Sequence, residues 1–367
     1  MSKIWTVAVV GCGIGRRHIA TGYAKHPDKF RVLALCDLDE ARLEAVGNEF
    51  AVPRRTTSFD DVLRMDDIDI IDVSTPPALH VPQSVAALAA GKHVVCEKPL
   101  AGSLADADRL IAAEATARGR LMPVFQYRFG DGLQKARRVI DQGLAGRAYL
   151  ATVETAWSRT ADYYAVPWRG RWDTELGGVV VSHAIHSHDL LTWLMGPIAS
   201  VFARMATRVN PIESEDCAVA SLVMANGALA SLSATLGSHK EISRLRLCFE
   251  HVTFESCLEP YAPGDEPWEI VPATSEMAGR IERALAGCTP VPAGYEGLFQ
   301  RYHAALESGG TLPVTLADAR RSLELITALY DSAERGQPIT LPIGPQHSKY
   351  RSWRPLSTPA NARPPDQ

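Results

Sequence analysis

The sequence predicts an α/β fold with two domains: a doubly wound parallel sheet, then an α+β domain with a large, open, mainly antiparallel sheet. Three observations lead to this prediction. In the first third of the 367 residues, apolar runs alternate with helical stretches, and a glycine-rich turn follows the first run. Later runs are separated by short turns alone, and two helical segments come last. Strands joined by helices form parallel sheets, whereas strands joined by turns form antiparallel ones.

The expected elements follow from these runs in order. Parallel strands are expected at 4–10, 31–37, 69–73, 93–96 and 121–125. The second sheet is expected to take strands at 148–156, 201–207, 218–224, 228–236, 245–249 and 252–256, with helices at 294–308 and 316–335. The first domain would then span 1–125 and the second 126–345. Residues 346–367 are rich in Pro, Ser, Arg and Asn, which is typical of an extended or disordered tail.

Composition narrows the class of protein. Hydrophobic residues make up 46% and charged residues 22%, and the net charge of -4 shows no basic bias, so neither nucleic acid nor a membrane is an expected partner. The first strand starts near residue 4, which leaves no room for a signal peptide, and we expect a cytoplasmic protein. The seven cysteines form no Cys-x-x-Cys pair and are expected to be buried free thiols.

A glycine-rich turn follows the first apolar run. Gly11, Gly13 and Gly15 alternate with Cys12 and Ile14, one residue shorter than the usual dinucleotide-binding spacing. Glycines let backbone amides approach a pyrophosphate, and the next helix presents its positive end there. A glycine turn can also be only a tight connection, so it needs support from elsewhere in the chain.

That support comes from Asp37, the acid that ends the second apolar run about 20 residues after the turn. An aspartate there accepts the ribose hydroxyls of an adenosine and repels a 2′-phosphate, which favours NAD over NADP. Arg42 lies close by in the sequence and would offset part of that repulsion, which leaves NADP open. The alternative interpretation of Asp37 is a cap for the helix starting near Asp39.

Lys98 ends the strand at 93–96 within the run Glu97-Lys98-Pro99. The carboxyl ends of parallel strands form the ligand-binding edge of such a sheet, where an ammonium meets a small polar substrate. An isolated lysine at a strand end more often projects into water. The glycine turn and Asp37 favour the functional interpretation.

A histidine-rich helix is expected after Gly177-Gly178. Helical spacing places Ser182, His186 and Asp189 on one face, with His183 and His188 turned toward the flanks. A histidine facing a cleft can exchange a proton with a substrate hydroxyl near neutral pH, although a structural histidine is equally consistent with this segment. The histidine spacings do not suit zinc, so no metal is expected.

The segment before this helix offers substrate contacts. Trp168 and Trp172 flank Arg169 and Arg171, and aromatic faces stack on sugar rings while arginines bind hydroxyls or carboxylates. The alternative is that the tryptophans anchor a long loop. Gln126 and Arg128, directly after the strand at 121–125, would reach the same cleft or merely begin the crossover between domains.

With these motifs in place, the chain resembles the Gfo/Idh/MocA family, the glucose-fructose oxidoreductase and inositol dehydrogenase group, over residues 4 to about 343. The resemblance rests on the glycine turn, Asp37, the run from Ser74 to His80, Glu97-Lys98-Pro99, and Gly177 to Asp189. It implies an N-terminal Rossmann domain, a C-terminal open sheet used for dimer or tetramer contacts, and hydride transfer between NAD(P) and a hydroxyl or ketone of a sugar, sugar acid or cyclitol.

The resemblance also implies roles for particular residues. Thr75, Pro76 and His80 would line the nicotinamide half, although Pro76-Pro77 is also consistent with a rigid turn. Glu97 and Lys98 would lie against the nicotinamide ribose and substrate, and His186 would take the hydroxyl proton. His183 is a further substrate-binding candidate of the same segment.

One departure affects the expected chemistry. Ser182 stands where many of these dehydrogenases have an aspartate, four residues before the histidine, and Ala184 replaces a common glycine. A serine only hydrogen-bonds, whereas an aspartate would raise the basicity of the histidine. Ser182 is therefore a third, weaker catalytic candidate. A redox-neutral lyase or glycosidase that uses bound NAD transiently, and a non-catalytic NAD-binding sensor, remain the alternatives to a dehydrogenase.

Overall fold

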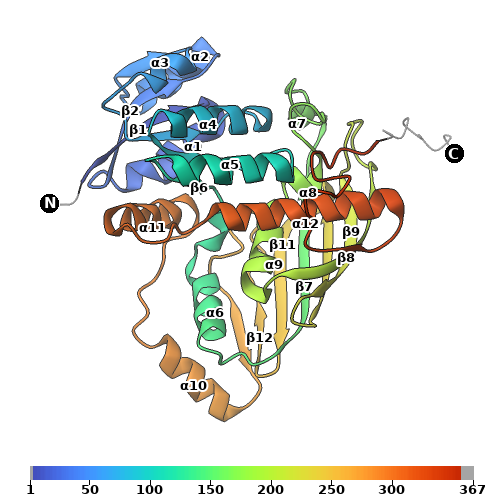
Figure 1. Cartoon of the computed structure of the whole chain (residues 1–367). Coiled ribbons are helices and arrows are strands. Elements are labelled where there is room, and N and C mark those ends of the chain that lie inside the picture. The colour runs from blue at the N-terminus through green and yellow to red at the C-terminus, as the bar shows by residue number, and fades with distance from the viewer. Residues whose placement is uncertain (1–2, 357–367) are drawn as a thin grey trace.

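The computed structural model describes residues 3–356 and contains two sheets in the predicted order (Figure 1). The first sheet has six strands in the order β3-β2-β1-β4-β5-β6, and every neighbouring pair is parallel. Its strands are β1 (Trp5–Val10), β2 (Phe30–Cys36), β3 (Arg54–Thr56), β4 (Ile70–Val73), β5 (His93–Cys96) and β6 (Leu121–Pro123). Five of the six strands match the predicted runs, whereas β3 escaped prediction because Arg54-Arg55-Thr56 carries no apolar pattern at the edge of the sheet.

Helices connect these strands, which explains why the sheet is parallel. They are α1 (Cys12–Thr21), α2 (Glu40–Glu49), α3 (Phe59–Leu63), α4 (His80–Ala89) and α5 (Leu104–Thr116). Val7, Ala8 and Val9 of β1 are fully buried, as expected for a strand with layers on both faces. The carboxyl ends of the strands therefore form one edge of this layer, and the loops after β1, β2, β4 and β5 meet there.

The second sheet has eight strands in the order β13-β12-β11-β7-β10-β9-β8-β14. They are β7 (Ala148–Ser158), β8 (Ile198–Ala206), β9 (Cys217–Met224), β10 (Leu229–Thr235), β11 (Gly237–Phe249), β12 (Val252–Glu255), β13 (Glu269–Pro272) and β14 (Ile339–Thr340). Only β7 and β10 pair in parallel, so the sheet is mainly antiparallel as predicted. The short edge strands β13 and β14 were not predicted from the sequence.

Seven α-helices follow β6 in the part of the chain that the structure describes. They are α6 (Asp131–Asp141), α7 (Ala161–Tyr164), α8 (Val179–Ser182), α9 (Ile185–Met195), α10 (Ser275–Leu285), α11 (Gly294–Ser308) and α12 (Leu316–Arg335). The bounds of α11 and α12 agree with the prediction. Helix α11 packs on α1, and α12 contacts α5 of the first domain as well as α9 and β8 of the second (Figure 1).

The histidine-rich helix differs from the prediction because it is broken. Helix α8 ends at Ser182, His183 has a non-helical backbone (φ -122°, ψ -59°), and α9 starts at Ile185. The break changes the angular relation between residues on either side. Ser182 and His186 therefore do not share the continuous helical face that the spacing predicted.

The C-terminal segment is packed rather than free as far as Leu356. It contains neither helix nor strand from 346 to 356, but Trp353 is 1% exposed and its Nε1 donates to the Leu176 carbonyl oxygen over 2.7 Å. Tyr350 OH also donates to Asp108 Oδ2 over 2.5 Å. The rest of the predicted tail, 357–367, lies outside the described residues.

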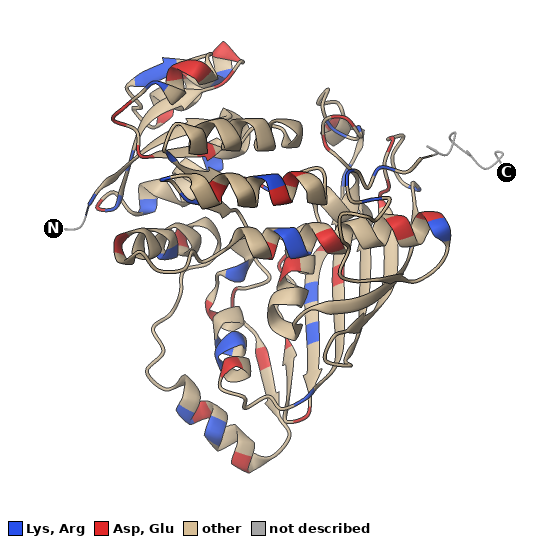
Figure 2. Ribbon diagram, viewed as in Figure 1, with Lys and Arg blue, Asp and Glu red and all other residues tan. Residues whose placement is uncertain are grey.

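Three further findings concern the described residues. Figure 2 shows basic and acidic residues interspersed along helices such as α5, α10 and α12. Between residues 3 and 356, none of the helices is long and apolar enough to cross a membrane. All seven cysteines are free thiols, as predicted, but only Cys12, Cys36, Cys96 and Cys257 are buried, whereas Cys217, Cys248 and Cys288 are partly exposed.

Candidate active site

One cavity of about 940 Å³ lies where the carboxyl edge of the first sheet meets the second domain. The loops after β1, β2, β4 and β5 line one part of it, and α8, α9 and the segment from Trp157 to Arg169 line the other. Most of the sequence-predicted site residues lie on its wall. Gly15, His80, Arg128 and Trp172 do not.

The glycines of the turn are of two kinds: two lie in close contact with neighbouring atoms, and one faces open space. Gly11 has φ +94°, and a Cβ there would lie 2.4 Å from the Ser74 carbonyl oxygen, while a Cβ on Gly15 would lie 2.5 Å from Val9 Cγ1. These two glycines allow close packing. Gly13 has open space around its Cβ position, and with Ile14 it lines the cavity at the start of α1. Unobstructed backbone amides at a helix N-terminus fit a pyrophosphate.

Asp37 lies beside this turn and is not a helix cap. Its Oδ2 accepts the Cys12 amide over 2.7 Å and its Oδ1 accepts the Asp39 amide over 2.9 Å. The cap of α2 is Asp39, whose side chain accepts the Arg42 amide. Carboxylate oxygens keep further lone pairs, so Asp37 can still accept ribose hydroxyls. Arg42 Nη1 lies 3.4 Å from Asp37 Oδ2, and this basic group is near enough to moderate the charge.

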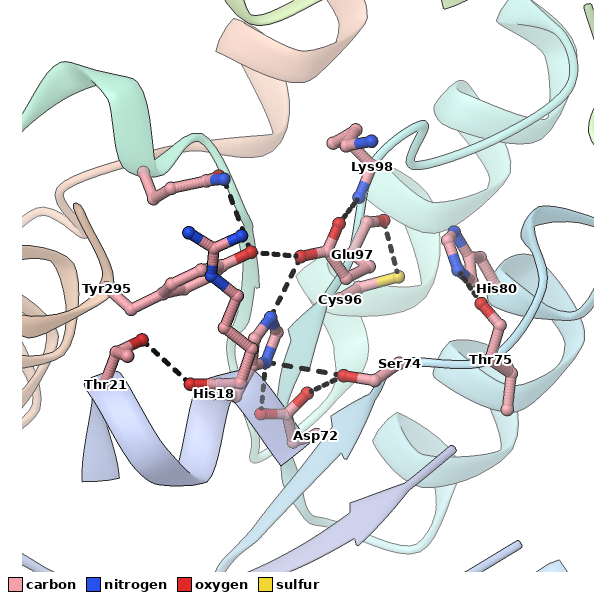
Figure 3. A network of polar contacts seen from close by, with 12 residues as sticks. His18, Thr21, Asp72, Ser74, Thr75, His80, Cys96, Glu97, Lys98 and Tyr295 are labelled. Atoms are coloured by element: carbon pink, nitrogen blue, oxygen red, sulfur yellow. Dashed lines mark hydrogen bonds and ion pairs between the residues drawn. The ribbon is translucent and has the colours of Figure 1, made fainter. Parts of the chain in front are cut away.

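The loops after β4 and β5 are held together by His80. Thr75 and Pro76 line the cavity, whereas His80 is buried behind them. Its Nδ1 lies 2.7 Å from the Pro99 carbonyl oxygen and its Nε2 lies 2.8 Å from the Thr75 carbonyl oxygen. Burial lowers the pKa of His80. The predicted contact of His80 with a cofactor is therefore replaced by a supporting position between two loops (Figure 3).

Lys98 faces the cavity and not bulk water. Its Nζ donates to the Ser182 carbonyl oxygen over 2.9 Å, which joins the end of β5 to the end of α8. Burial lowers the pKa of Lys98, and the Glu97 carboxylate opposes that effect. An ammonium has three N–H groups, so the others are available to a ligand.

His186 enters the same cavity from α9. Its ring stacks on Tyr127 with centroids 4.3 Å apart, and its Nδ1 has no hydrogen-bond partner between residues 3 and 356. Burial, assisted by Lys98, lowers the pKa of His186 to about 3. The imidazole is therefore neutral near pH 7, and one of its ring nitrogens is unprotonated and can accept a hydrogen bond.

Ser182 contacts His183 and not His186. Its Oγ donates to the Gly178 carbonyl oxygen over 2.7 Å and lies 2.6 Å from His183 Nδ1. Arg159 Nε donates to His183 Nε2 over 3.2 Å. A guanidinium can only donate, so His183 carries its proton on Nδ1 and donates to Ser182. These contacts use both ring nitrogens of His183, and Ser182 has no contact through which to act on His186.

The side chains of Arg128 and Trp172 bind other groups of the protein and do not line the cavity. Arg128 forms two hydrogen bonds of 2.6 Å with Asp189 and an ion pair of 3.2 Å with Asp318, and it is 3% exposed. Trp172 Nε1 donates to the Glu213 carbonyl oxygen over 3.0 Å. These contacts favour the alternative interpretations from the sequence. Arg128 is a residue of the crossover between the domains, and Trp172 anchors a loop. Their predicted substrate contacts are not present at the cavity wall.

The other substrate candidates do line the cavity. The Arg169 guanidinium lies over the Tyr163 ring at 3.9 Å and over the Trp168 ring at 4.3 Å, and it faces Glu175. Gln126 Nε2 donates to Tyr295 OH over 3.3 Å. This part of the wall combines flat aromatic faces with a cation, which suits rings that carry hydroxyl or carboxylate groups.

Sequence reasoning missed several lining residues. Arg159 stacks over Trp157, Tyr163 and Tyr261, with its guanidinium 5.1, 5.0 and 5.9 Å from the three ring centroids. Trp157 and Arg159 stand at the end of β7, where a strand-end signal of the kind used for Lys98 could have found them. Tyr261 and Tyr295 come from distant segments, and no local pattern indicates them.

The fold and this cavity define a dinucleotide-binding α/β protein with a ligand site between two domains. A family model described as an oxidoreductase family with an NAD-binding Rossmann fold matches residues 5–125, and one described as a GFO/IDH/MocA C-terminal domain matches residues 133–255. The chain belongs to this family of oxidoreductases. Its first domain is an NAD-binding Rossmann domain.

Similar proteins act on sugars or sugar derivatives. The structure of the WlbA dehydrogenase from Bordetella pertussis in complex with NADH and UDP-GlcNAcA superposes with a TM-score of 0.82 at 30% identity, covering 94% of this chain and 100% of that one. Levoglucosan dehydrogenase of Pseudarthrobacter phenanthrenivorans is 24% identical over 92% of this chain and 98% of its own length. D-apiose dehydrogenase of Paraburkholderia graminis is 24% identical over 91% of this chain and 89% of its own.

Proposed function

We propose that this protein is an NAD-dependent oxidoreductase that transfers a hydride between the nicotinamide and a hydroxyl or ketone of a sugar, sugar acid or cyclitol. The observation that carries the proposal is the meeting of Lys98 and His186 in the cavity that also contains the glycine turn and Asp37. A cation and a neutral base on opposite domains, next to a dinucleotide site, are the groups that alcohol oxidation requires.

NAD fits the residues of the first domain. The open space at Gly13 and the start of α1 would hold the pyrophosphate, and Asp37 would hold the adenosine ribose. When bound, the nicotinamide supplies the hydride acceptor or donor. The side chain of Arg42 is half-exposed and already paired with Asp37 and Asp39, so we assign NAD as the preferred cofactor over NADP.

The residues of the chain would then share the proton and the charge. As the C–H hydrogen leaves with its electron pair, His186 takes the O–H proton and the carbon becomes a carbonyl. The Lys98 ammonium binds the reacting oxygen and stabilises the negative charge that develops on it. In the reverse direction, His186 returns the proton to the new hydroxyl.

The substrate side of the cavity supports a sugar that carries a carboxylate. Lys98 and Arg169 supply cationic donors, and Trp168 and Tyr163 supply aromatic faces. The WlbA structure, with its complex of UDP-GlcNAcA, supports the same class of ligand.

A panel of polyols, aldoses and uronic acids tests this proposal, with NAD and NADP supplied separately and NADH followed at its absorbance band. Substrate-dependent formation of the reduced nucleotide, faster with NAD (as NADH) than with NADP (as NADPH), supports the proposed reaction. The absence of any reaction with all three substrate classes would overturn it. A uronic acid preferred over its neutral aldose supports the acidic sugar, and the opposite order contradicts it.

The contacts of Ser182 favour one second candidate, a redox-neutral lyase or glycosidase that oxidises and re-reduces its substrate. Ser182 supplies no carboxylate to His186, since its Oγ is engaged by Gly178 and His183. Product analysis by chromatography during the same panel separates the two reactions. Product without accumulation of NADH identifies the redox-neutral enzyme.

We also propose that the outer face of the second sheet joins two copies of the chain. Leu150, Leu229 and Val223 lie side by side across β7, β10 and β9 and are 44%, 54% and 43% exposed. An apolar sheet face of this kind is usually covered by another layer. Light scattering on Leu229→Glu tests it: the variant should have half the mass of the wild type, and an unchanged mass contradicts the proposal.

A further inference from the structure

A buried histidine beneath the cavity lies between two carboxylates. His18, on α1, has its Nδ1 2.9 Å from Asp72 Oδ2 and its Nε2 2.9 Å from Glu97 Oε1 (Figure 3). His18 and Asp72 are fully buried and Glu97 is 4% exposed. The three side chains come from α1, β4 and the end of β5, so the contact joins three separate elements of the first domain.

The geometry determines the charge of His18. Carboxylates accept hydrogen bonds, and a neutral imidazole has one N–H only. Both ring nitrogens face ionised oxygens, so both must carry a proton. His18 is therefore an imidazolium, and the cluster of Asp72, His18 and Glu97 has a net charge of one negative unit.

Electrostatics support this assignment. Burial lowers the pKa of His18, but the Asp72 and Glu97 carboxylates outweigh it and raise the pKa to about 10. Burial conversely raises the pKa of Glu97, and its hydrogen bond to His18 reverses this, bringing the pKa to about 2. Ser74 Oγ also lies 3.4 Å from His18 Nδ1, and further hydroxyl groups donate to the carboxylates. Tyr23 OH and Ser74 Oγ donate to Asp72, and Tyr295 OH donates to Glu97 Oε1 over 3.2 Å.

The cluster connects directly to the cavity. Glu97 Oε2, the oxygen that His18 does not contact, accepts the backbone amide of Lys98 over 3.1 Å. Glu97, Lys98 and Tyr295 all line the cavity, whereas His18 does not. The Tyr295 ring lies over His18 with centroids 4.6 Å apart, which covers the imidazolium from the side of α11.

We propose that His18 is a positioning residue: its imidazolium keeps Glu97 ionised and fixed, so that Glu97 holds the Lys98 amide and directs the Lys98 ammonium across the cavity. A neutral residue at position 18 would leave two buried carboxylates without a cation. Burial would then raise the pKa of Glu97, because the contact with His18 is the main cause that lowers it, and Glu97 would take up a proton more readily. The role of Lys98 in turnover rests on the proposed function. The positioning of the Lys98 ammonium by Glu97 does not depend on that function.

The test therefore measures the titration of Lys98 in the absence of any substrate. Lysines are dimethylated with ¹³C-formaldehyde, the Lys98 signal is assigned by its loss in Lys98→Arg, and its titration is followed by NMR. In His18→Asn, loss of the Glu97 charge should lower the titration midpoint of Lys98 by about one pH unit. Ile19→Ala, a buried neighbour on α1 outside the cluster, is the matched control and should leave the midpoint unchanged. Equal midpoints in wild type and His18→Asn would overturn the proposal.

A second variant keeps the test decisive if His18→Asn does not fold. Asp72→Asn leaves His18 paired with Glu97 alone, so His18 should titrate at lower pH than in the wild type. The Lys98 signal should then shift at the same pH as the His18 ring signals, because the two groups communicate through Glu97. A Lys98 signal that does not follow the His18 titration contradicts the positioning role. Neither readout depends on whether the protein turns over a sugar.

Discussion

Lys98 Nζ donates to the carbonyl oxygen of Ser182 over 2.9 Å, so the ammonium at the carboxyl end of β5 is held by the last residue of α8. One domain supplies the charge and the other supplies the backbone that orients it.

The first prediction concerns Lys98 itself. Lys98→Met should lower kcat/KM by about two to three orders of magnitude, because charge developing on the substrate oxygen loses its cation. NADH affinity, measured by fluorescence titration, should change little. Lys92→Met is a suitable control, since Lys92 precedes the same strand and its ammonium binds the Met65 and Ile68 carbonyls outside the cavity. Full activity in Lys98→Met would remove Lys98 from the mechanism.

The second prediction concerns cofactor choice. Asp37→Ala should weaken NAD binding by roughly ten- to a hundredfold, because hydrogen bonds to a charged acceptor are each worth about 1.5–3 kcal/mol. NADP binding should improve relative to NAD, since the repelling carboxylate is gone and Arg42 remains. Calorimetric titration with both nucleotides measures the ratio. In Arg42→Ala, the preference for NAD should become stronger, and a shift toward NADP there would contradict the assignment.

The third prediction concerns stability at acidic pH. Burial lowers the pKa of His188 to about 3 in the folded protein, below its usual value of about 6.5. The unfolded chain therefore binds the proton first. The stability from keeping His188 neutral is fully present above pH 6.5 and is lost as pH falls toward 3.

Urea unfolding at two pH values checks this effect. The drop in unfolding free energy between pH 7 and pH 5 should be smaller in His188→Gln than in the wild type by roughly 1–2 kcal/mol. His239→Gln, which replaces an exposed histidine, serves as the control and should leave the drop unchanged. An identical drop in all three proteins would show that His188 is not buried in its neutral form.

The fourth prediction separates structure from substrate binding at Arg128. Arg128→Met leaves Asp189 and Asp318 without their shared cation, which should cost about 3–5 kcal/mol of stability. KM for the substrate identified in the panel should stay within a factor of about two of the wild type when measured well below the melting temperature. A large rise in KM without loss of stability would restore Arg128 as a substrate contact.

The sequence predicts the layers well because each has a periodic signal of its own. The strands of both sheets and the helices α11 and α12 follow apolar patterns that depend only on neighbours in the chain. Edge strands are missed because a strand that pairs with only one other strand needs little apolar surface, as Arg54–Thr56 illustrates. Lys98, Asp37 and Gly13 could be found because strand ends and glycine turns have fixed places in a doubly wound sheet. His186 could be found from the histidine-rich segment after Gly177-Gly178 and from the family resemblance.

The failures have a common physical cause, which is contact between residues far apart in the chain. Arg128 follows a strand end just as Lys98 does, but Asp318, from α12, turns it away from the cavity. Ser182 and His186 have helical spacing, but the non-helical backbone of His183 separates them. The charge of His18 depends on Asp72 and Glu97, and neither is its neighbour in sequence.

The hydrogen bond from Trp353 to the Leu176 carbonyl has a practical consequence for anyone who shortens this chain. Leu176 precedes the Gly177-Gly178 turn and has a positive φ of 69°, and α8 starts directly after that turn. The last described residues thus brace the turn that sets where Ser182, and with it the Lys98 ammonium, lies. Truncation at the compositional boundary near residue 345 would keep both sheets and every proposed catalytic side chain, yet would remove a distant support of the site they share.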